Sequence, residues 1–154
     1  MIPAYAEAIS MTILTENSVH FEYQVDGNDF TRAGEVSSDI KNKLKMMNVS
    51  PKAVRNVAIA MYEGEINMVI HANGGVIDID IFSDRLIMSL KDTGPGIADI
   101  DQAMQEGFST ASADVVNLGF GAGMGLPNMK RATDEMKIES ELGVGTTVTM
   151  TVYF

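Results

Sequence analysis

An apolar strand that ends in a carboxylate and two glycines places the strongest constraint on this chain. Residues 85–91 alternate, so Asp92 points to the same side as the core residues of that strand. An unpartnered carboxylate there is costly, so a protein amide or the exocyclic amine of a purine is expected to meet it. Gly94 and Gly96 let the backbone turn sharply and approach a ligand, with Ile97 directly after them. The stretch predicts the floor of a nucleotide pocket, and an ordinary turn is the alternative.

A long apolar helix with two polar residues on one face is predicted over residues 51–72. Ser50 is a good N-cap, and Pro51 suits the first helical position. Glu63 and Asn67 are four residues apart and therefore share a face. An amide oxygen at Asn67 suits a magnesium ion held by phosphates, and Glu63 can accept a proton from an attacking hydroxyl. A hydrogen-bonded pair in the core is the alternative interpretation.

Three further polar residues are assigned non-catalytic positions. Glu65 is two residues from both Glu63 and Asn67, on roughly the opposite side of the helix, which predicts a rim or partner-facing charge. His71, near the helix end, is expected to be structural. His20 lies on the polar side of an alternating strand at 19–25 and is expected to face water.

A glycine-rich segment precedes the last predicted helix. Residues 98–106 suit one or two helical turns, and 107–125 predict a mobile loop, so a lid is expected over 98–123. The segment leads into a helix predicted from Met124 to Met136, and such a junction favours phosphate because backbone N–H groups and the helix dipole attract anions. Its spacing fits neither Walker A nor the dinucleotide fingerprint, and a flexible hinge is the alternative. The glycines concerned are Gly119, Gly121, Gly123 and Gly125.

The order of predicted elements indicates an α+β fold. It is a two-layer α/β sandwich, with a mixed, mainly antiparallel sheet and all helices on one face. One domain is expected over residues 18–154, preceded by an arm or extra strand at 1–17. The remaining predicted elements are a strand at 19–25, a helix from Asp29 to Asn48, and strands at 76–82, 137–142 and 146–154.

Composition excludes several classes of function. A net charge of −10 argues against nucleic-acid binding, which depends on Lys and Arg at phosphates. The chain has no cysteine, so disulfides and thiolate metal sites are excluded. Neither a signal peptide nor an apolar run long enough for a membrane span is present, and a cytoplasmic location is expected.

Four motifs in register resemble a known superfamily. Glu63-x-x-x-Asn67, Asp92-x-Gly94-x-Gly96, Gly121-x-Gly123-x-Gly125 and Gly145-Thr146-Thr147 are similar to the N, G1 and G2 boxes and the terminal Gly-Thr element of the Bergerat-fold, histidine-kinase-like (GHKL) ATPases. Within that superfamily, residues 18–154 most resemble the anti-sigma regulatory serine/threonine kinases, including the switch-kinase branch. Residues 103–110, 125–127 and 138–140 are similar to that branch.

The resemblance implies roles for the motif residues. Asn67 would be the magnesium ligand, Glu63 the general base and Asp92 the adenine contact, with Thr146 or Thr147 close to the base. ATP or ADP with Mg²⁺ would be the cofactors. The glycines from 119 to 125 would hold the phosphates, and Ile97, Met124 and Leu126 would complete the nucleotide site.

The same resemblance implies partners. The substrate would be a serine or threonine on a small antagonist domain of the STAS type, and a sigma factor or regulatory phosphatase would bind. A homodimer through the outer sheet face is also implied, where Thr147, Thr149, Thr151 and Tyr153 would lie. Relative to the switch kinases the lid inserts residues 111–118, and Glu65 replaces a small or apolar residue.

Two other classes fit the same motifs. A non-catalytic switch would bind nucleotide and gate partner affinity, and Glu63→Ala would then spare regulation. A detached histidine-kinase catalytic domain would require a helical hairpin with an exposed phosphoacceptor histidine. Neither His20 in a strand nor His71 at a helix end meets that requirement.

Overall fold

The computed structural model describes residues 17–108 and 124–154, and it contains a five-stranded antiparallel sheet with strand order β1-β2-β3-β5-β4. The expected arm at 1–17, apart from residue 17, and much of the expected lid at 98–123 therefore lie outside the described residues. The strands are β1 (Val19–Asp26), β2 (Gly74–Ile81), β3 (Arg85–Asp92), β4 (Glu135–Glu141) and β5 (Gly145–Tyr153). The helices are α2 (Glu35–Met46), α3 (Pro51–His71), α4 (Ile100–Ala103) and α6 (Gly125–Ala132).

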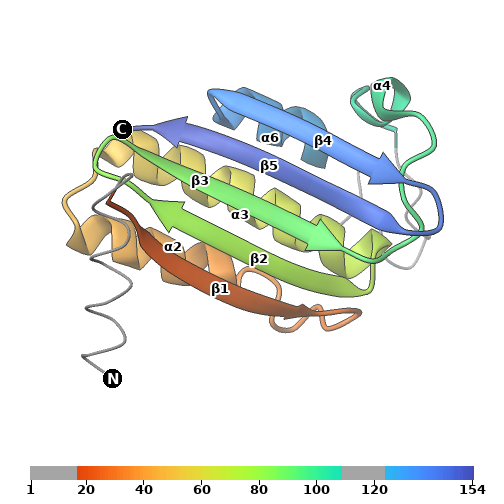
Figure 1. Ribbon diagram of the computed structural model, residues 1–154, viewed down its shortest axis with the longest axis horizontal. Coiled ribbons are helices and arrows are strands. Elements are labelled where there is room, and N and C mark those ends of the chain that lie inside the picture. The colour runs from red at the N-terminus through yellow and green to blue at the C-terminus, as the bar shows by residue number, and fades with distance from the viewer. Residues whose placement is uncertain (1–16, 109–123) are drawn as a thin grey trace.

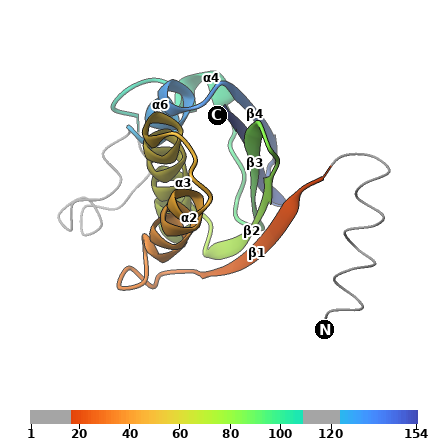
Figure 2. The ribbon, with the colours of Figure 1, turned by 90° about the vertical axis from the view of Figure 1, so that its left-hand side faces the viewer.

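The helices α2, α3 and α6 cover one face of the sheet and leave the other face open (Figures 1 and 2). The central strand β3 pairs with β2 on one side and β5 on the other, both antiparallel. This two-layer arrangement confirms the α+β class and the placement of helices on a single face. Among the described residues, no helix has the length and apolar character to cross a bilayer.

Strand alternation separates the core from the open face. Ile77, Ile79, Leu86, Met88 and Met150 are fully buried between sheet and helices. The residues between them in sequence, among them Asp78, Ser89 and Thr149, project to the other side. The period-two pattern therefore gave the correct face of β1, β2, β3 and β5. Asp92, in phase with Leu86 and Met88, faces the helical layer.

Helix α3 begins and ends as predicted, but the N-cap of α2 lies five residues later than expected. Ser50 accepts a hydrogen bond from the Ala53 amide at 3.4 Å, and Pro51 is the first residue of α3. Asp29, the predicted N-cap of the preceding helix, instead holds a turn by accepting from Thr31 N and Oγ1 at 3.2 and 2.6 Å. The N-cap of α2 is Gly34, with a φ of 98° that favours glycine.

The last helix is shorter than predicted. It ends at Ala132, and Thr133 is already extended, with φ −119° and ψ 153°. Met136 lies in β4 opposite Met150, so the prediction of helix up to this residue was wrong. The apolar residues Met129, Ala132 and Met136 have the spacing of one helical face, which explains the error. In the structure the first two point inward from α6 and the third points inward from β4.

Candidate nucleotide-binding site

The polar pair on α3 lies against the start of α6. A Cβ placed on Gly125, the first residue of α6, would be 3.2 Å from Asn67 Oδ1 and 3.3 Å from Glu63 Oε2. Both side chains are half-buried, and the positions between them on the helix are buried. Gly125 has no Cβ to crowd these two oxygens, which lie at a helix N-terminus, where backbone N–H groups favour an anion.

Two residues of α6 fix the orientation of Glu63. Asn128 Nδ2 donates to Glu63 Oε1 at 3.3 Å, and Arg131 Nη2 donates to Asn128 Oδ1 at 2.6 Å. Because a guanidinium only donates, it holds the oxygen of the Asn128 amide toward itself and the NH₂ toward Glu63. Arg131 Nη1 also contacts Glu106 Oε1 at 2.6 Å, just before the segment outside the described residues. Glu63 Oε2 is thereby left toward Gly125.

Asp92 receives its partners from the protein backbone. Its Oδ1 accepts from Gly94 N at 3.0 Å and from Thr146 N at 3.1 Å. The sequence left open whether a protein amide or the amine of a purine meets this carboxylate, and in the structure two protein amides do so. Within residues 17–108 and 124–154 both bonds go to Oδ1, so Oδ2 is the oxygen that can accept from a ligand.

The loop after Asp92 is held between α3 and the β4–β5 hairpin by close backbone approach. A Cβ on Gly94 would be 2.7 Å from Ala72 Cα, directly after α3. Gly96 has a φ of 80°, and its Cβ would be 2.5 Å from the carbonyl oxygen of Glu141. Gly145 packs against the carbonyl group of Asp92. Larger residues at these positions would push the loop away from α3 and from the β4–β5 hairpin.

A serine missed at the sequence level links this loop to β5. Ser140 Oγ accepts from Ile97 N at 2.7 Å and lies 2.7 Å from Thr146 Oγ1. Thr146 is buried on the helix-facing side, together with Asp92, whereas Thr147 points to the open face between Lys91 and Glu139. The sequence feature that could have identified Ser140 is its position on the inner side of an alternating strand, where the other inward residues are apolar.

The remaining predicted site residues are only partly placed. Met124 is the N-cap of α6, and Leu126 packs on the hydrophobic core. Gly119, Gly121 and Gly123 lie outside the described residues. The structure therefore brings Glu63, Asn67 and Gly125 together as one group, and the Asp92 loop with Ser140 and Thr146 as a second group.

Glu65 is buried, and the expectation of a rim or partner-facing charge was wrong. The residue is 2% exposed. Its Oε2 accepts from Gly34 N and Val36 N at 3.0 and 3.2 Å, and its Oε1 accepts from Ser37 N at 3.2 Å. These amides are the free donors at the N-terminus of α2, whose dipole also favours a carboxylate. Burial raises the pKa of Glu65 against the lowering effect of the three amides. Glu65 thus caps α2 from α3.

The two histidines occupy different environments. His71 is half-buried at the end of α3, and burial lowers its pKa. His20 is exposed on the open face of β1, as the strand alternation predicts.

Comparison with known proteins gives the family. The model of the histidine kinase-, DNA gyrase B-, and HSP90-like ATPases matches residues 43–154. The chain is 34% identical to the serine/threonine-protein kinase RsbT of Bacillus subtilis over 112 residues, covering 70% of this chain and 78% of that protein. It is also 34% identical to an anti-sigma F factor of Caldanaerobacter subterraneus over 121 residues, covering 79% and 77%.

A solved structure shares the fold. The chain superposes on a protein in the crystal structure of the SiaB-SiaC complex from Pseudomonas aeruginosa with a TM-score of 0.57 and 11% identity, over 99% of this chain and 98% of that one. The two-layer fold, the polar pair on α3 and the family match agree with one another. The chain belongs to the histidine kinase-, DNA gyrase B-, and HSP90-like ATPase family. Within that family its function is that of a partner-switching serine/threonine protein kinase of the RsbT and anti-sigma factor type, which confirms the expected class.

Proposed function

We propose that the chain transfers the γ-phosphoryl group of ATP to a serine or threonine hydroxyl of a STAS-type antagonist domain, with Glu63 as the general base. The observation that supports this role best is the position of Glu63 Oε2 and Asn67 Oδ1 beside Gly125, at the N-terminus of α6. A carboxylate, a hard oxygen ligand and a phosphate-binding helix end then occur within one small volume.

The proposed reaction uses few protein groups. The hydroxyl oxygen attacks the γ-phosphorus, the bond to the β,γ-bridging oxygen breaks, and ADP leaves. Glu63 takes the hydroxyl proton through Oε2, while Asn128 holds Oε1 in place. Asn67 would hold Mg²⁺ through its amide oxygen, and the ion would neutralise charge on the phosphates.

The adenine position is inferred from the second group of residues. Asp92 Oδ1 is occupied by two backbone amides, so its carboxylate is fixed and Oδ2 can accept from the exocyclic amine of adenine. Thr146, rather than Thr147, lies on this side of the sheet. Ile97 and the Gly94–Gly96 turn border the same position.

The lid and the domain limits belong to the proposal too. We infer one domain over 18–154, with a lid over 98–123 that includes the phosphate-binding Gly119, Gly121 and Gly123. The ion pair between Glu106 and Arg131 ties the first part of this segment to α6, next to Asn128. A sigma factor or a regulatory phosphatase is the expected second partner.

Nucleotide binding is tested first, because it requires no knowledge of the partner. Calorimetric titration with ADP and ATP, with and without Mg²⁺, is expected to give micromolar affinity that both Asp92→Asn and Asn67→Ala weaken. The Asn67→Ala variant should lose mainly the magnesium-dependent part. Absence of binding at millimolar nucleotide would contradict the proposal at its first step.

Phosphoryl transfer is tested with radiolabelled ATP and a panel of purified STAS domains. Glu63→Gln keeps the shape of the side chain but cannot accept a proton, so it should bind nucleotide normally and transfer at least about a hundredfold more slowly. If transfer to every STAS domain is unchanged in Glu63→Gln and Glu63→Ala, Glu63 is not the base. Regulation that survives without any transfer would indicate the non-catalytic switch.

A further inference from the structure

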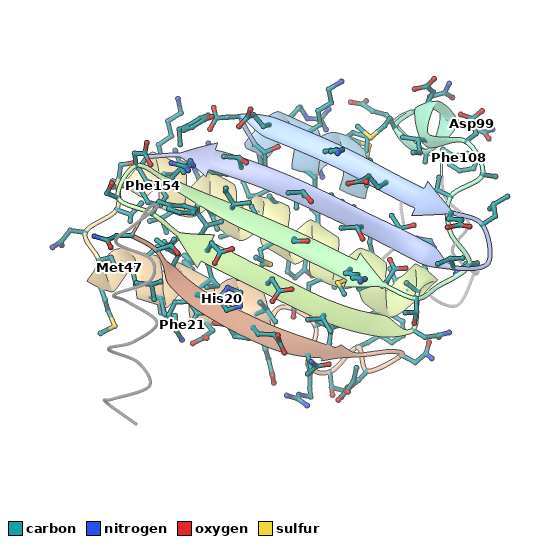
Figure 3. All side chains as sticks on the ribbon, in the orientation of Figure 1. His20, Phe21, Met47, Asp99, Phe108 and Phe154 are labelled. Atoms are coloured by element: carbon teal, nitrogen blue, oxygen red, sulfur yellow. The ribbon has the colours of Figure 1, made fainter. Side chains whose placement is uncertain are left out.

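Four ionisable side chains meet on the open face of the sheet, away from the helices and the nucleotide site. His20 and Glu22 project from β1, and Asp78 and Asp80 project from β2. In the antiparallel register His20 is opposite Asp80, and Glu22 is opposite Asp78. Figure 3 shows His20 on the side of the sheet that faces away from the helices.

The imidazole of His20 lies between two carboxylates. Its Nδ1 is 2.7 Å from Asp80 Oδ1, and its Nε2 is 3.3 Å from Asp78 Oδ1. A neutral imidazole carries one N–H, so it can donate to only one of these carboxylates. If the shorter contact holds that proton, it is on Nδ1, and Nε2 faces the Asp78 carboxylate. A cation between these two atoms makes the arrangement favourable, and it is either a second proton, because the hydrogen bond to Asp80 and the charges of Asp80 and Asp78 raise the pKa of His20, or a metal ion.

The distances between the donor atoms suit a metal ion as that cation. One ring nitrogen of His20 and one carboxylate oxygen each from Glu22 and Asp78 lie within 4.8 Å of one another. In a tetrahedral site with bonds of about 2.0–2.1 Å, neighbouring ligand atoms are about 3.3–3.4 Å apart. The 3.3 Å between Nε2 and Asp78 Oδ1 already matches this edge. The other ligand atoms are at most 4.8 Å apart, so small side-chain movements bring the set to this spacing.

Asp80 completes the arrangement without touching the metal. A histidine that binds a metal commonly donates its other N–H to a carboxylate, which fixes the tautomer and the plane of the ring. The hydrogen bond from Nδ1 to Asp80 has this geometry. Three carboxylates around one imidazole, on a chain of net charge −10, also favour a cation electrostatically.

We propose that His20, Glu22 and Asp78 form a surface site for a first-row divalent metal ion of the Zn²⁺ type, with Asp80 as the positioning residue. One nitrogen and two carboxylate oxygens suit Zn²⁺, whereas Mg²⁺ prefers oxygen ligands alone and retains its water. The protein supplies three ligands, so the fourth position is open to water or to a ligand from outside. This site is independent of the proposed nucleotide chemistry, because β1 and β2 carry it on the opposite face of the sheet.

The test is a Zn²⁺ titration of the full chain, without a polyhistidine tag and without nucleotide, near pH 7.5. The chain has only two histidines, so a ¹⁵N spectrum of the imidazole nitrogens reports on both in one experiment. We expect saturable shifts at His20 Nε2 with one equivalent of Zn²⁺ and unchanged signals from His71. Mg²⁺ at the same concentration should leave both unchanged.

Matched variants locate the ligands. Glu22→Gln and Asp78→Asn keep size and hydrogen-bonding ability, so each should weaken the calorimetric Zn²⁺ affinity at least about tenfold, and Asp80→Asn about tenfold. Asp84→Asn, an exposed carboxylate in the β2–β3 turn, is the control and should bind Zn²⁺ as the parent does. Non-saturating shifts, equal response of both histidines, or parental affinity in Glu22→Gln and Asp78→Asn would overturn the proposal and leave a second proton as the cation at Nε2.

Discussion

At the scale of single residues, the carboxylate of Glu65 determines how α2 meets α3. It lies on the same helix as Glu63 and Asn67 but turns to the N-terminus of α2, where three amides bind it. Among the described residues, α2 receives no capping bond from the side chain of its own N-cap, since that residue is Gly34. The long-range cap therefore replaces the local one. It also joins the element that contributes Glu63 to the neighbouring helix.

The first prediction concerns this cap. The two carboxylate oxygens of Glu65 together accept three hydrogen bonds from backbone amides. In Glu65→Gln an NH₂ group, which cannot accept, replaces one of these oxygens, so at least one amide loses its partner. The substitution should lower the free energy of unfolding by about 1–3 kcal/mol, measured by urea denaturation. The control is Glu35→Gln, an exposed residue of the same helix end, which should cost less than about 1 kcal/mol. Equal midpoints for the two variants would refute the capping role.

The second prediction concerns His71, whose pKa burial lowers from the ordinary value of 6.5. The unfolded chain takes up a proton near that pH, whereas the folded chain resists it until lower pH. Stability from this group is therefore present above pH 6.5 and is lost as pH falls through the folded pKa. The difference in unfolding free energy between the parent and His71→Gln should shrink from pH 8 to pH 5. A difference that is constant across this range would contradict the buried environment.

At the scale of elements, sequence patterns gave all the strands and the long helix, because periodicity and local capping determine them. Ser50 and Pro51 are adjacent in sequence and mark the start of α3 locally, and α3 begins where they predict. The start of α2 was not predictable in this way. Its cap is Glu65, which lies 30 residues further along, and Asp29 forms a turn of its own. The alternation of β4 marks Ser140, but no local pattern marks its distant partner Ile97.

The third prediction tests how closely the Asp92 loop must approach the end of α3. In Gly94→Ala the new Cβ would be 2.7 Å from Ala72 Cα, so the loop must shift and its hydrogen bond to Asp92 Oδ1 weakens. We expect calorimetric ADP affinity to fall about tenfold or more, the loss of roughly one hydrogen bond to a charged group. In the control, Gly143→Asn, the residue has a φ of 77° that asparagine tolerates and no neighbour within 4 Å of the added Cβ. Equal affinity in the two variants would show that the close approach is not needed.

At the scale of the whole molecule, a single helical layer leaves one face of the sheet to solvent (Figure 2). That face is polar, with the His20 cluster over β1 and β2 and the outward Thr147 and Thr149 on β5. The layer order followed from the order of the predicted elements, and the family followed from four motifs in register. Neither of them predicts which polar residues contact one another across the open face, because the pairing of the strands determines these contacts. This face combines an excess of acidic groups with few apolar side chains.

The last prediction follows from the charge of the molecule. A net charge of −10 on a small domain produces mutual repulsion that the unfolded chain relieves. The ion pairs of the described residues, such as Arg131 with Glu106, are largely exposed and contribute little, so salt screens more repulsion than attraction. The melting temperature should rise by about 2–5 °C between about 0.02 and 0.3 M NaCl. Glu141 is exposed at the end of β4. Glu141→Lys makes the net charge less negative by two units and should reduce this rise in melting temperature. Glu141→Gln makes it less negative by one unit and should reduce the rise about half as much. A melting temperature that falls with salt would mean that the exposed pairs outweigh the excess of acidic charge.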